Sequence, residues 1–341
     1  QLMSGTTPSV VTLTPAPVLD RTYFVSNLVP GGVNRADAVG EELAGKGINV
    51  SRGLVLGGIN SPAVVPIGAG DPNVLARTGS SDLVVPLWVE GTPRVSTTII
   101  DFAGTTTRIT EPPRPLSGDD WKKTVELAEK TVRESGAKWL VIGGAHPIDK
   151  STGRFVDLTD LFDRMDRLGV RVALDTSGEP LSFWSRSGRA AVIKPNCEEL
   201  ASAVGRTLNT VGDVIDAATE LCNHGIEAVL ASMGSDGIIA VTKDGYFGAS
   251  TAPVKVKNTV GAGDATLAGF LQAVASNPLA EGEEILGVGF DVVLGARTAV
   301  RWGATKVQQS TSGLENIDNL PESFLNETPD RSKLLDEPAE A

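Results

Sequence analysis

Helix-like and strand-like segments alternate through the second half of the chain, and this alternation most restricts the fold. Apolar residues recur at helical spacing in some segments, and short β-branched runs lie between them. Alternation of this kind predicts a mostly parallel sheet with helices on both faces. Ligands of such folds bind beyond the carboxyl ends of the strands. The expected helices cover residues 119–135, 158–168 and 211–224, and the expected strands cover residues 139–142, 170–175, 191–194 and 228–231.

The first half of the chain contains extended segments that stand apart from this alternation. Residues 10–13 predict a first strand, and residues 93–109 alternate in polarity around a turn, which predicts a hairpin. We expect the segments at about 20–38 and 92–110 to pair as a small sheet that covers the site. The polar, acidic tail after Ser310 contains several prolines and is expected to be loosely held.

Composition excludes several classes of function. The 341-residue chain carries a formal net charge of −12, which argues against nucleic acid or an anionic membrane as its main partner. Cys197 and Cys222 form no CxxC pair, and only His146 and His224 could join them, so a zinc site is not expected. No membrane-spanning apolar run and no secretory signal are visible, so reduced thiols and a cytoplasmic location are expected.

The run Asn-Thr-Val-Gly-Ala-Gly-Asp at residues 258–264 predicts an anion-binding helix start. Gly261, Ala262 and Gly263 let a ligand approach the backbone closely, and a helical pattern follows them. Free N–H groups and the positive end of a helix dipole would then face an anion. Asp264 could take the proton from a hydroxyl that attacks a bound phosphate. The motif therefore predicts phosphoryl transfer to an alcohol, and the structural alternative is a tight turn with Asp264 as a helix cap.

The same four letters, Gly-Ala-Gly-Asp, also occur at residues 68–71, which provides an internal comparison. Pro72 and Asn73 follow, and the helical pattern after them is weak, so a turn after a strand explains this copy without chemistry. The copy at 261–264 instead follows a strand-like run at 254–256 and precedes a strong helical pattern. We therefore assign a function only to the second copy.

Two further segments carry residue types that suit a sugar. Asp20 follows the first strand and could bind two hydroxyls, although a surface aspartate is an equal alternative. Residues 45–49 resemble a loop that enters a helix, with Asn49 able to bind hydroxyls. The run at 40–46 is not a phosphate-binding P-loop, because Gly47 stands where Ser or Thr should hold magnesium.

Residues 194–199 form another strand end followed by a helix start. Asn196 and Glu199 lie on one helix face and could orient waters around Mg²⁺. A helix cap with acidic residues in the first turn is the structural alternative. A substrate phosphate could be held by arginines on the extended segments, namely Arg35, Arg94 and Arg108.

In order and spacing these motifs resemble the ribokinase-like (PfkB) carbohydrate kinases over nearly the full chain. Within that family the chain is similar to the branch of 1-phosphofructokinase, tagatose-6-phosphate kinase and the minor 6-phosphofructokinase. The motif that ends at Asp264 is specific for the superfamily. The combination of Val-Asn-Arg, Asp-Thr-Ser-Gly and Lys-Pro-Asn indicates the phosphosugar branch. The resemblance is carried by residues 18–22, 33–35, 45–50, 174–178, 193–200 and 259–264.

The resemblance implies an α/β fold with a ribokinase-like, Rossmann-type core, a mostly parallel sheet and a small β-sheet lid. In that family the lid often mediates dimers, so a homodimer through the lid is expected. The core would comprise residues 1–19, 40–91 and 111–315, the lid residues 20–39 and 92–110, and the acidic tail residues 316–341.

The resemblance also implies roles for single residues, with ATP as phosphate donor, Mg²⁺ as cofactor and a sugar phosphate as acceptor. Asp264 would be the general base, and Gly261, Ala262 and Gly263 would form the anion hole. Arg94 would bind the phosphate that the sugar already carries. The other acceptor residues would be Asp20, Gly45, Lys46, Asn49 and His146, and Lys194, Asn196, Ser232, Gly234 and Gly237 would serve the nucleotide, with Asn196 and Glu199 near Mg²⁺ through water.

The chain departs from the family pattern at the acceptor end. Family members read Ser-Gly-Ser-Leu-Pro where residues 143–147 read Gly-Gly-Ala-His-Pro. Ala145 therefore lacks a substrate-binding hydroxyl, and His146 is bulky and titratable. The lid motif Thr-Arg-x-Asn is Pro-Arg-Val-Ser at residues 93–96. These changes concern the acceptor and leave the catalytic motif intact.

The leading prediction is an ATP-dependent, Mg²⁺-requiring kinase that converts D-fructose 1-phosphate to fructose 1,6-bisphosphate. The altered loop leaves other acceptors as an alternative, such as tagatose 6-phosphate, fructose 6-phosphate, an unphosphorylated sugar or a nucleoside. A sugar-phosphate-binding protein without catalysis is the second alternative. A nicotinamide dehydrogenase is disfavoured, because no G-x-G-x-x-G opens a helix after the first strand.

Overall fold

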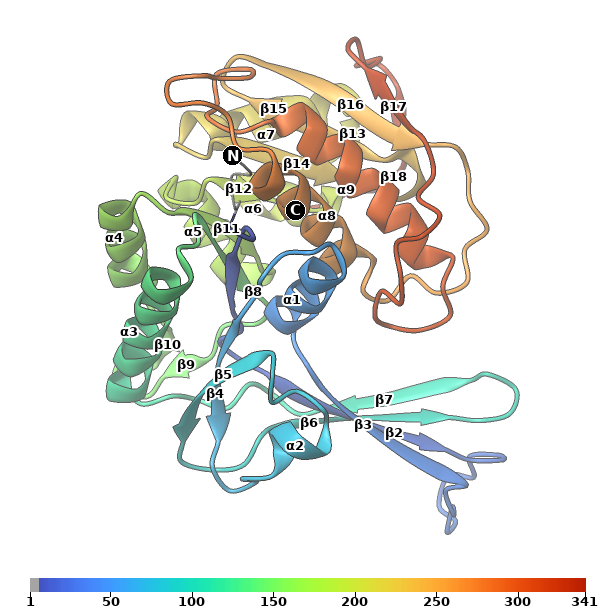
Figure 1. Ribbon diagram of the computed structural model, residues 1–341. Helices are drawn as coiled ribbons and strands as arrows, with labels where there is room; N and C mark the ends of the chain where they lie inside the picture. Colours follow the sequence, from blue (N-terminus) through green and yellow to red (C-terminus); the bar gives the residue numbers. More distant parts are fainter. Residues whose placement is uncertain (1–5) are drawn as a thin grey trace.

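The computed structural model describes residues 6–341, so the first five residues of the expected core segment 1–19 lie outside it. A ten-stranded sheet forms the centre of this described part (Figure 1). Neighbouring strands from β5 to β14 run parallel, and β15, β16 and β17 continue the sheet antiparallel. The mostly parallel sheet expected from the alternation is confirmed. Across the sheet the strands are β17 (Ser323–Asn326), β16 (Gly245–Thr251), β15 (Ile238–Thr242), β14 (Ala228–Ser232), β12 (Val192–Ile193), β11 (Arg171–Asp175), β8 (Trp139–Gly143), β1 (Val10–Leu13), β4 (Ala63–Gly68) and β5 (Val84–Val89).

Helices cover both faces of this sheet, because successive strand side chains point to opposite sides and both sides are apolar. Leu140 in β8 packs into one core cluster, and its neighbour Val141 packs into the other. Within residues 6–341 no helix combines the length and the apolarity that a membrane crossing requires. One face carries α1 (Lys46–Leu56), α8 (Ala262–Ser276) and α9 (Val292–Val307), and the other carries α3 (Gly118–Ser135), α4 (Thr159–Leu168), α5 (Gly178–Ser187), α6 (Cys197–Val204) and α7 (Val211–Asn223).

A separate four-stranded sheet projects from the core at the lower right of Figure 1. Its strands lie in the order β3 (Ala38–Ala44), β2 (Val18–Phe24), β6 (Val95–Ile100) and β7 (Thr106–Thr110). The hairpin predicted over residues 93–109 is confirmed as β6 and β7, and β2 pairs with β6 in parallel. The small sheet is longer than the segments expected for it, because β2 begins at Val18 and β3 continues to Ala44.

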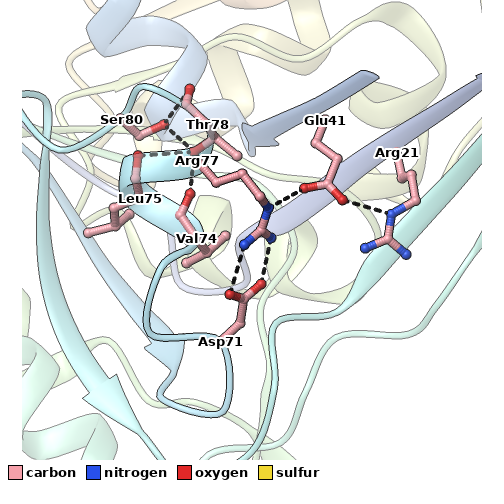
Figure 2. Close-up of polar contacts among 8 residues, drawn as sticks. All are labelled: Arg21, Glu41, Asp71, Val74, Leu75, Arg77, Thr78 and Ser80. Carbon is pink, nitrogen blue, oxygen red and sulfur yellow. Dashed lines mark hydrogen bonds and ion pairs between the residues drawn. The ribbon is translucent and has the colours of Figure 1, made fainter. Parts of the chain in front are cut away.

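A network of charged side chains connects this sheet to the core (Figure 2). Arg77, at the end of the short helix α2 (Val74–Arg77), donates to both carboxylate oxygens of Asp71 at 3.0 and 2.6 Å. The same guanidinium donates to Glu41 of β3 at 2.7 Å, and Arg21 of β2 donates to the other oxygen of Glu41. Asp71, in the first Gly-Ala-Gly-Asp copy, is therefore held in a structural ion pair.

The expectation of a loosely held tail is wrong for the C-terminal residues. β17 extends the central sheet along β16, and β18 (Leu334–Ala339) pairs with β13 (Leu208–Thr210). Arg297 and Arg301 of α9 also donate to Ser323 and to the Pro321 carbonyl, at 2.9 and 2.7 Å. An exposed sheet edge offers unpaired backbone groups, and a polar segment can pair with them without a long apolar run. The remaining short elements are β9 (Ile148–Asp149), β10 (Arg154–Phe155) and η1 (Gly234–Asp236).

Candidate active site

The helix start predicted after residues 258–263 is present as the N-terminus of α8. The helix begins at Ala262, and Gly261 occupies the N-cap position with a left-handed backbone (φ 78°). A Cβ atom at Gly261 would collide with the carbonyl oxygen of Ser312, so only glycine fits. The strand expected at 254–256 is wrong: no strand forms there, because these residues pair with no neighbouring strand, and Lys255 and Val256 are exposed. The Ala262 amide donates to the Thr259 carbonyl at 3.2 Å, but no side chain caps the helix, so the amides of Gly261 and Gly263 are available to an anion.

Asp264 lies in the first turn of α8 and is held by an amide, not by a cation. Its Oδ2 accepts a hydrogen bond from Asn49 Nδ2 at 2.9 Å, and the residue is 9% exposed. The structural alternative, in which Asp264 caps the helix, is therefore wrong. Burial, together with the negative charge of Asp175, raises the pKa of Asp264 to about 6. A carboxylate with this pKa is ionised at neutral pH and is a stronger base than an exposed one.

Two lysines lie close to Asp175, a residue near Asp264 to which the sequence analysis assigns no role. Asp175, buried at the carboxyl end of β11, lies 3.3 Å from Lys46 Nζ and 3.9 Å from Lys194 Nζ. Burial opposes its ionisation, but the ammonium groups of Lys194 and Lys46 hold the pKa of Asp175 below its usual value. Its position at a strand end within the family segment 174–178 was the available signal.

Lys194 also faces the anion-binding helix start. It follows β12 directly, and a Cβ atom on Gly263 would lie 3.1 Å from its Nζ. The ammonium group therefore stands against the first turn of α8. Asp175 thus links a lysine beside this turn to Lys46, the first residue of α1. This arrangement can balance the negative charge of a phosphoryl group in transfer.

The residues expected to bind the acceptor are only partly brought together. Gly45 is the N-cap of α1, and its carbonyl accepts a hydrogen bond from the backbone N–H of Asn49. The side-chain amide of Asn49 donates to Asp264. Asp20 lies in the small sheet, paired in register with Glu42, and burial raises its pKa. Arg94 donates to backbone carbonyls, namely those of Ala16, Pro17 and Glu111. The contact of Arg94 with a substrate phosphate stays a prediction.

His146 is enclosed in the loop after β8. It is 3% exposed, and neither ring nitrogen has a hydrogen-bond partner among the described residues. Burial lowers its pKa to about 4, so the imidazole is neutral at physiological pH. The end of β8, just before this loop, lies close against the start of α1, because a Cβ atom on Gly143 would lie 2.7 Å from the Gly47 amide nitrogen. The predicted contact of His146 with the sugar stays a prediction.

Two residues after Lys194, Asn196 is the N-cap of α6 and forms a capping box with Glu199. Asn196 Oδ1 accepts from the Glu199 amide at 2.8 Å, and Glu199 Oε2 accepts from the Asn196 amide at 3.0 Å. The structural alternative for this pair is therefore present. Within residues 6–341 no cluster of three metal-ligating His, Cys, Asp or Glu side chains occurs. The predicted role of these two residues near Mg²⁺ through water stays a prediction.

The predicted nucleotide loop follows β14 and lies beside this capping box. The Ser232 amide donates to the Pro195 carbonyl at 2.9 Å, and Ser232 forms a β-bridge with Asn196. Gly234 and Gly237 both have positive φ angles, and a Cβ atom on Gly237 would collide with the Ala249 carbonyl. The loop therefore needs these glycines for its shape. Their contact with a nucleotide stays a prediction.

An anion-binding helix start, a buried carboxylate of raised pKa and two ammonium groups at the carboxyl edge of an α/β sheet define a phosphotransferase. The chain belongs to the pfkB family of carbohydrate kinases, whose family model matches residues 14–316. It is therefore a sugar kinase, and kinases of this family use ATP as phosphate donor. The expectation of a sugar kinase is confirmed.

Individual relatives agree with this assignment. The chain is 33% identical to 1-phosphofructokinase of Haloferax volcanii, over 77% of this chain and 83% of the relative. It is 30% identical to ATP-dependent 6-phosphofructokinase isozyme 2 of Escherichia coli, over 86% of this chain and 93% of the relative. The crystal structure of Escherichia coli phosphofructokinase-2 in complex with potassium matches with a TM-score of 0.78 at 28% identity, covering 91% of this chain and 96% of that one.

Proposed function

We propose that this carbohydrate kinase transfers the terminal phosphoryl group of ATP to O6 of D-fructose 1-phosphate and forms fructose 1,6-bisphosphate. The observation that carries the proposal is the Asp264 carboxylate, which has a raised pKa and lies in the first turn of α8, where Lys194 faces Gly263. The choice of acceptor is supported by the several curated relatives that are named 1-phosphofructokinase.

The proposed reaction is an in-line displacement in which Asp264 acts as general base. Asp264 accepts the proton of the 6-hydroxyl while that oxygen attacks the terminal phosphorus. The bond between this phosphorus and the bridging oxygen breaks, and ADP leaves with the electron pair. The free amides at the start of α8 and the Lys194 ammonium offset charge on the transferred group. Asn49 keeps the carboxylate oriented through its hydrogen bond.

The residues of the donor side fit a hydrated Mg²⁺ ion. Glu199 uses Oε2 in the capping box, which leaves Oε1 available to a water molecule. Mg²⁺ prefers oxygen ligands and usually keeps several waters, so a direct protein ligand set is not required. When bound with ATP, the ion would neutralise charge on the triphosphate. Turnover should therefore stop with excess EDTA and return when Mg²⁺ is added.

The acceptor is tested by measuring ADP release with fructose 1-phosphate, fructose 6-phosphate, tagatose 6-phosphate and free fructose. We expect the highest kcat/KM with fructose 1-phosphate. A second candidate is the same transfer to another sugar phosphate, and the loop at 143–147 favours it, because Ala145 lacks a hydroxyl and His146 is buried. The highest kcat/KM with fructose 6-phosphate or tagatose 6-phosphate would select this candidate.

The four-stranded sheet is proposed as a lid through which two copies associate. Large apolar side chains are exposed on it, including Ile109 at 63% and Val39 at 55%. Exposed apolar area of this kind is common at contact surfaces. We expect a dimer by light scattering in the wild type and a monomer for Ile109→Glu. A monomeric wild type would contradict the lid dimer. The cytoplasmic location stays a prediction.

A further inference from the structure

The C-terminal tail is built into the fold, although no step of the proposed reaction uses it. The family model ends at residue 316, and β17 and β18 both lie beyond that residue. β17 extends the central sheet along β16, and β18 pairs with β13 (Figure 1). The link between these two strands is therefore anchored at both ends, and we call its residues 329–333 the strap.

The strap lies across the start of α7 and supplies two of its hydrogen bonds. The amides of Val211 and Gly212 donate to the carbonyls of Lys333 and Arg331 at 2.9 and 2.8 Å. The first amides of a helix have no partner within the helix, so the strap satisfies two of them. A Cβ atom on Gly212 would lie 2.9 Å from the Arg331 carbonyl oxygen, so the two backbones are in close contact. The main chain of Lys333 is thus fixed in place.

The side chain of Lys333 reaches from the strap to the loop after β14. Its Nζ lies 3.4 Å from Oδ1 of Asp236 in η1, and within residues 6–341 Asp236 forms no second ion pair. A cavity of about 110 Å³ lies between the two segments, and its lining includes Met233, Asp236, Pro329, Asp330 and Lys333. The ion pair therefore links two segments that face each other across this cavity.

The loop that Lys333 contacts, residues 232–237, lies at the carboxyl edge of the sheet, where ligands of α/β folds bind. β14 runs parallel to β12 beside it, and Ser232 at the end of β14 bridges to Asn196. Asn196 follows two residues after Lys194, whose ammonium group faces the start of α8. The loop therefore lies on the side of the site where the nucleotide is proposed to bind. A carboxylate without a cation there would repel a triphosphate, because like charges repel.

We propose that Lys333 is a positioning residue for the nucleotide, because its ammonium group neutralises Asp236 and holds the loop 232–237 against the strap. Since α7 already fixes the Lys333 backbone, closing the ion pair orders only the side chain. Both partners are partly exposed, at 55% and 38%, so their ion pair should add little to the free energy of unfolding. The expected effect falls on the loop and on KM for ATP. The role in turnover rests on the proposed function.

The test reverses the charge of Lys333 and then exchanges the two partners. In Lys333→Glu two carboxylates face each other, so we expect KM for ATP to rise by about 3- to 10-fold. The kcat and the KM for fructose 1-phosphate should stay within about twofold of wild type, because neither the base nor the acceptor side is changed. The exchanged pair, Lys333→Glu with Asp236→Lys, should return KM for ATP to within about twofold of wild type.

A second measurement follows the loop directly and needs no turnover. Hydrogen exchange of peptides that cover residues 232–237, without nucleotide, reports how often the loop opens. Exchange should be about 3- to 10-fold faster in Lys333→Glu and near the wild-type rate in the exchanged pair. If the wild type turns over no sugar phosphate, the proposed function fails, and calorimetric affinity for MgADP then replaces KM for ATP in this comparison.

Two further variants separate positioning from charge and from folding. Lys243→Glu makes the same charge change at an exposed lysine between β15 and β16 and should match the wild type in both measurements. If Lys333→Glu does not fold, Lys333→Met keeps the apolar stem without the charge, and its loop should still exchange faster than that of the wild type. The proposal is overturned by wild-type exchange or wild-type KM for ATP in the folded Lys333 variant, by an exchanged pair that behaves like Lys333→Glu, by equal effects of Lys243→Glu, or by a wild type that binds no MgADP.

Discussion

The two Gly-Ala-Gly-Asp copies have the same sequence and opposite environments. Asp71 is partly exposed and receives two hydrogen bonds from Arg77, which lower its pKa (Figure 2). Asp264 is buried, has an amide as its hydrogen-bond partner, and has its pKa raised to about 6. One carboxylate is therefore a weak base in a structural ion pair, and the other is suited to remove a proton.

The difference comes from the helix on the C-terminal side of each copy. The four-residue helix α2 brings Arg77 back onto Asp71. The fifteen-residue α8 packs its apolar residues into the core, so its first turn is fixed at the carboxyl edge of the sheet. Neighbouring chain segments, and not the tetrapeptide, decide whether the aspartate serves structure or chemistry.

The largest expected effect separates the two aspartates by activity. Asp264→Asn should lower kcat by about two to four orders of magnitude, because a general base is lost. Asp71→Asn is the matched control and should keep wild-type kcat. Both are measured by ADP release at saturating substrate. Equal activity of the two variants would refute the distinction between the two copies.

The pH dependence of kcat/KM should show which of the two aspartates accepts the proton. Asp264 must be ionised to accept a proton, so kcat/KM should fall by about tenfold per pH unit below its pKa of about 6. Asp71, whose pKa is lowered, titrates at more acidic pH and cannot produce this limb. A profile that stays flat to pH 4.5, with circular dichroism showing folded protein, would contradict the assignment.

Asp175→Asn tests whether the negative charge of Asp175 contributes to the raised pKa of Asp264. Removing its negative charge releases Lys46 and Lys194 and removes a cause of the raised Asp264 pKa. We expect kcat to fall by roughly tenfold from lost positioning, and the acidic limb of the kcat/KM profile to move to lower pH. Glu129→Gln is a control outside the site. A fall in kcat without any movement of the limb would leave Asp175 with no influence on Asp264.

The smallest expected effect concerns the free energy of unfolding, which Asp264→Asn and Asp71→Asn should change in opposite directions. The pKa of Asp264 rises from 3.8 to about 6 on folding, so stability is lost as pH rises through this window. Asp264→Asn should therefore raise the free energy of unfolding at pH 8 by about 1–3 kcal/mol. Asp71, with its lowered pKa, contributes stability that is lost as pH falls, so Asp71→Asn should lower it slightly. Urea unfolding at pH 8 checks both signs.

Sequence reasoning succeeded where the signal is local. The helix expected at 119–135 is present as α3, and the hairpin expected at 93–109 is present as β6 and β7. It failed where pairing is decided by a distant segment. The tail strands β17 and β18 are short segments of four and six residues in an acidic, proline-containing tail, and they form because β16 and β13 offer free edges. The role of Asp175 cannot be predicted from its neighbours in the sequence, because it depends on two lysines, Lys46 and Lys194, that are not adjacent to it in the chain.

The sequence by itself determined the α/β alternation, the small residues before α8 and the family, because periodicity and short motifs are written in neighbouring residues. Only the tertiary structure decided which aspartate is buried, which lysines meet at Asp175 and that Lys333 forms an ion pair with Asp236. The physical reason is that burial and electrostatic neighbours arise from contacts between segments that are remote in the chain, and these contacts set both pKa and position.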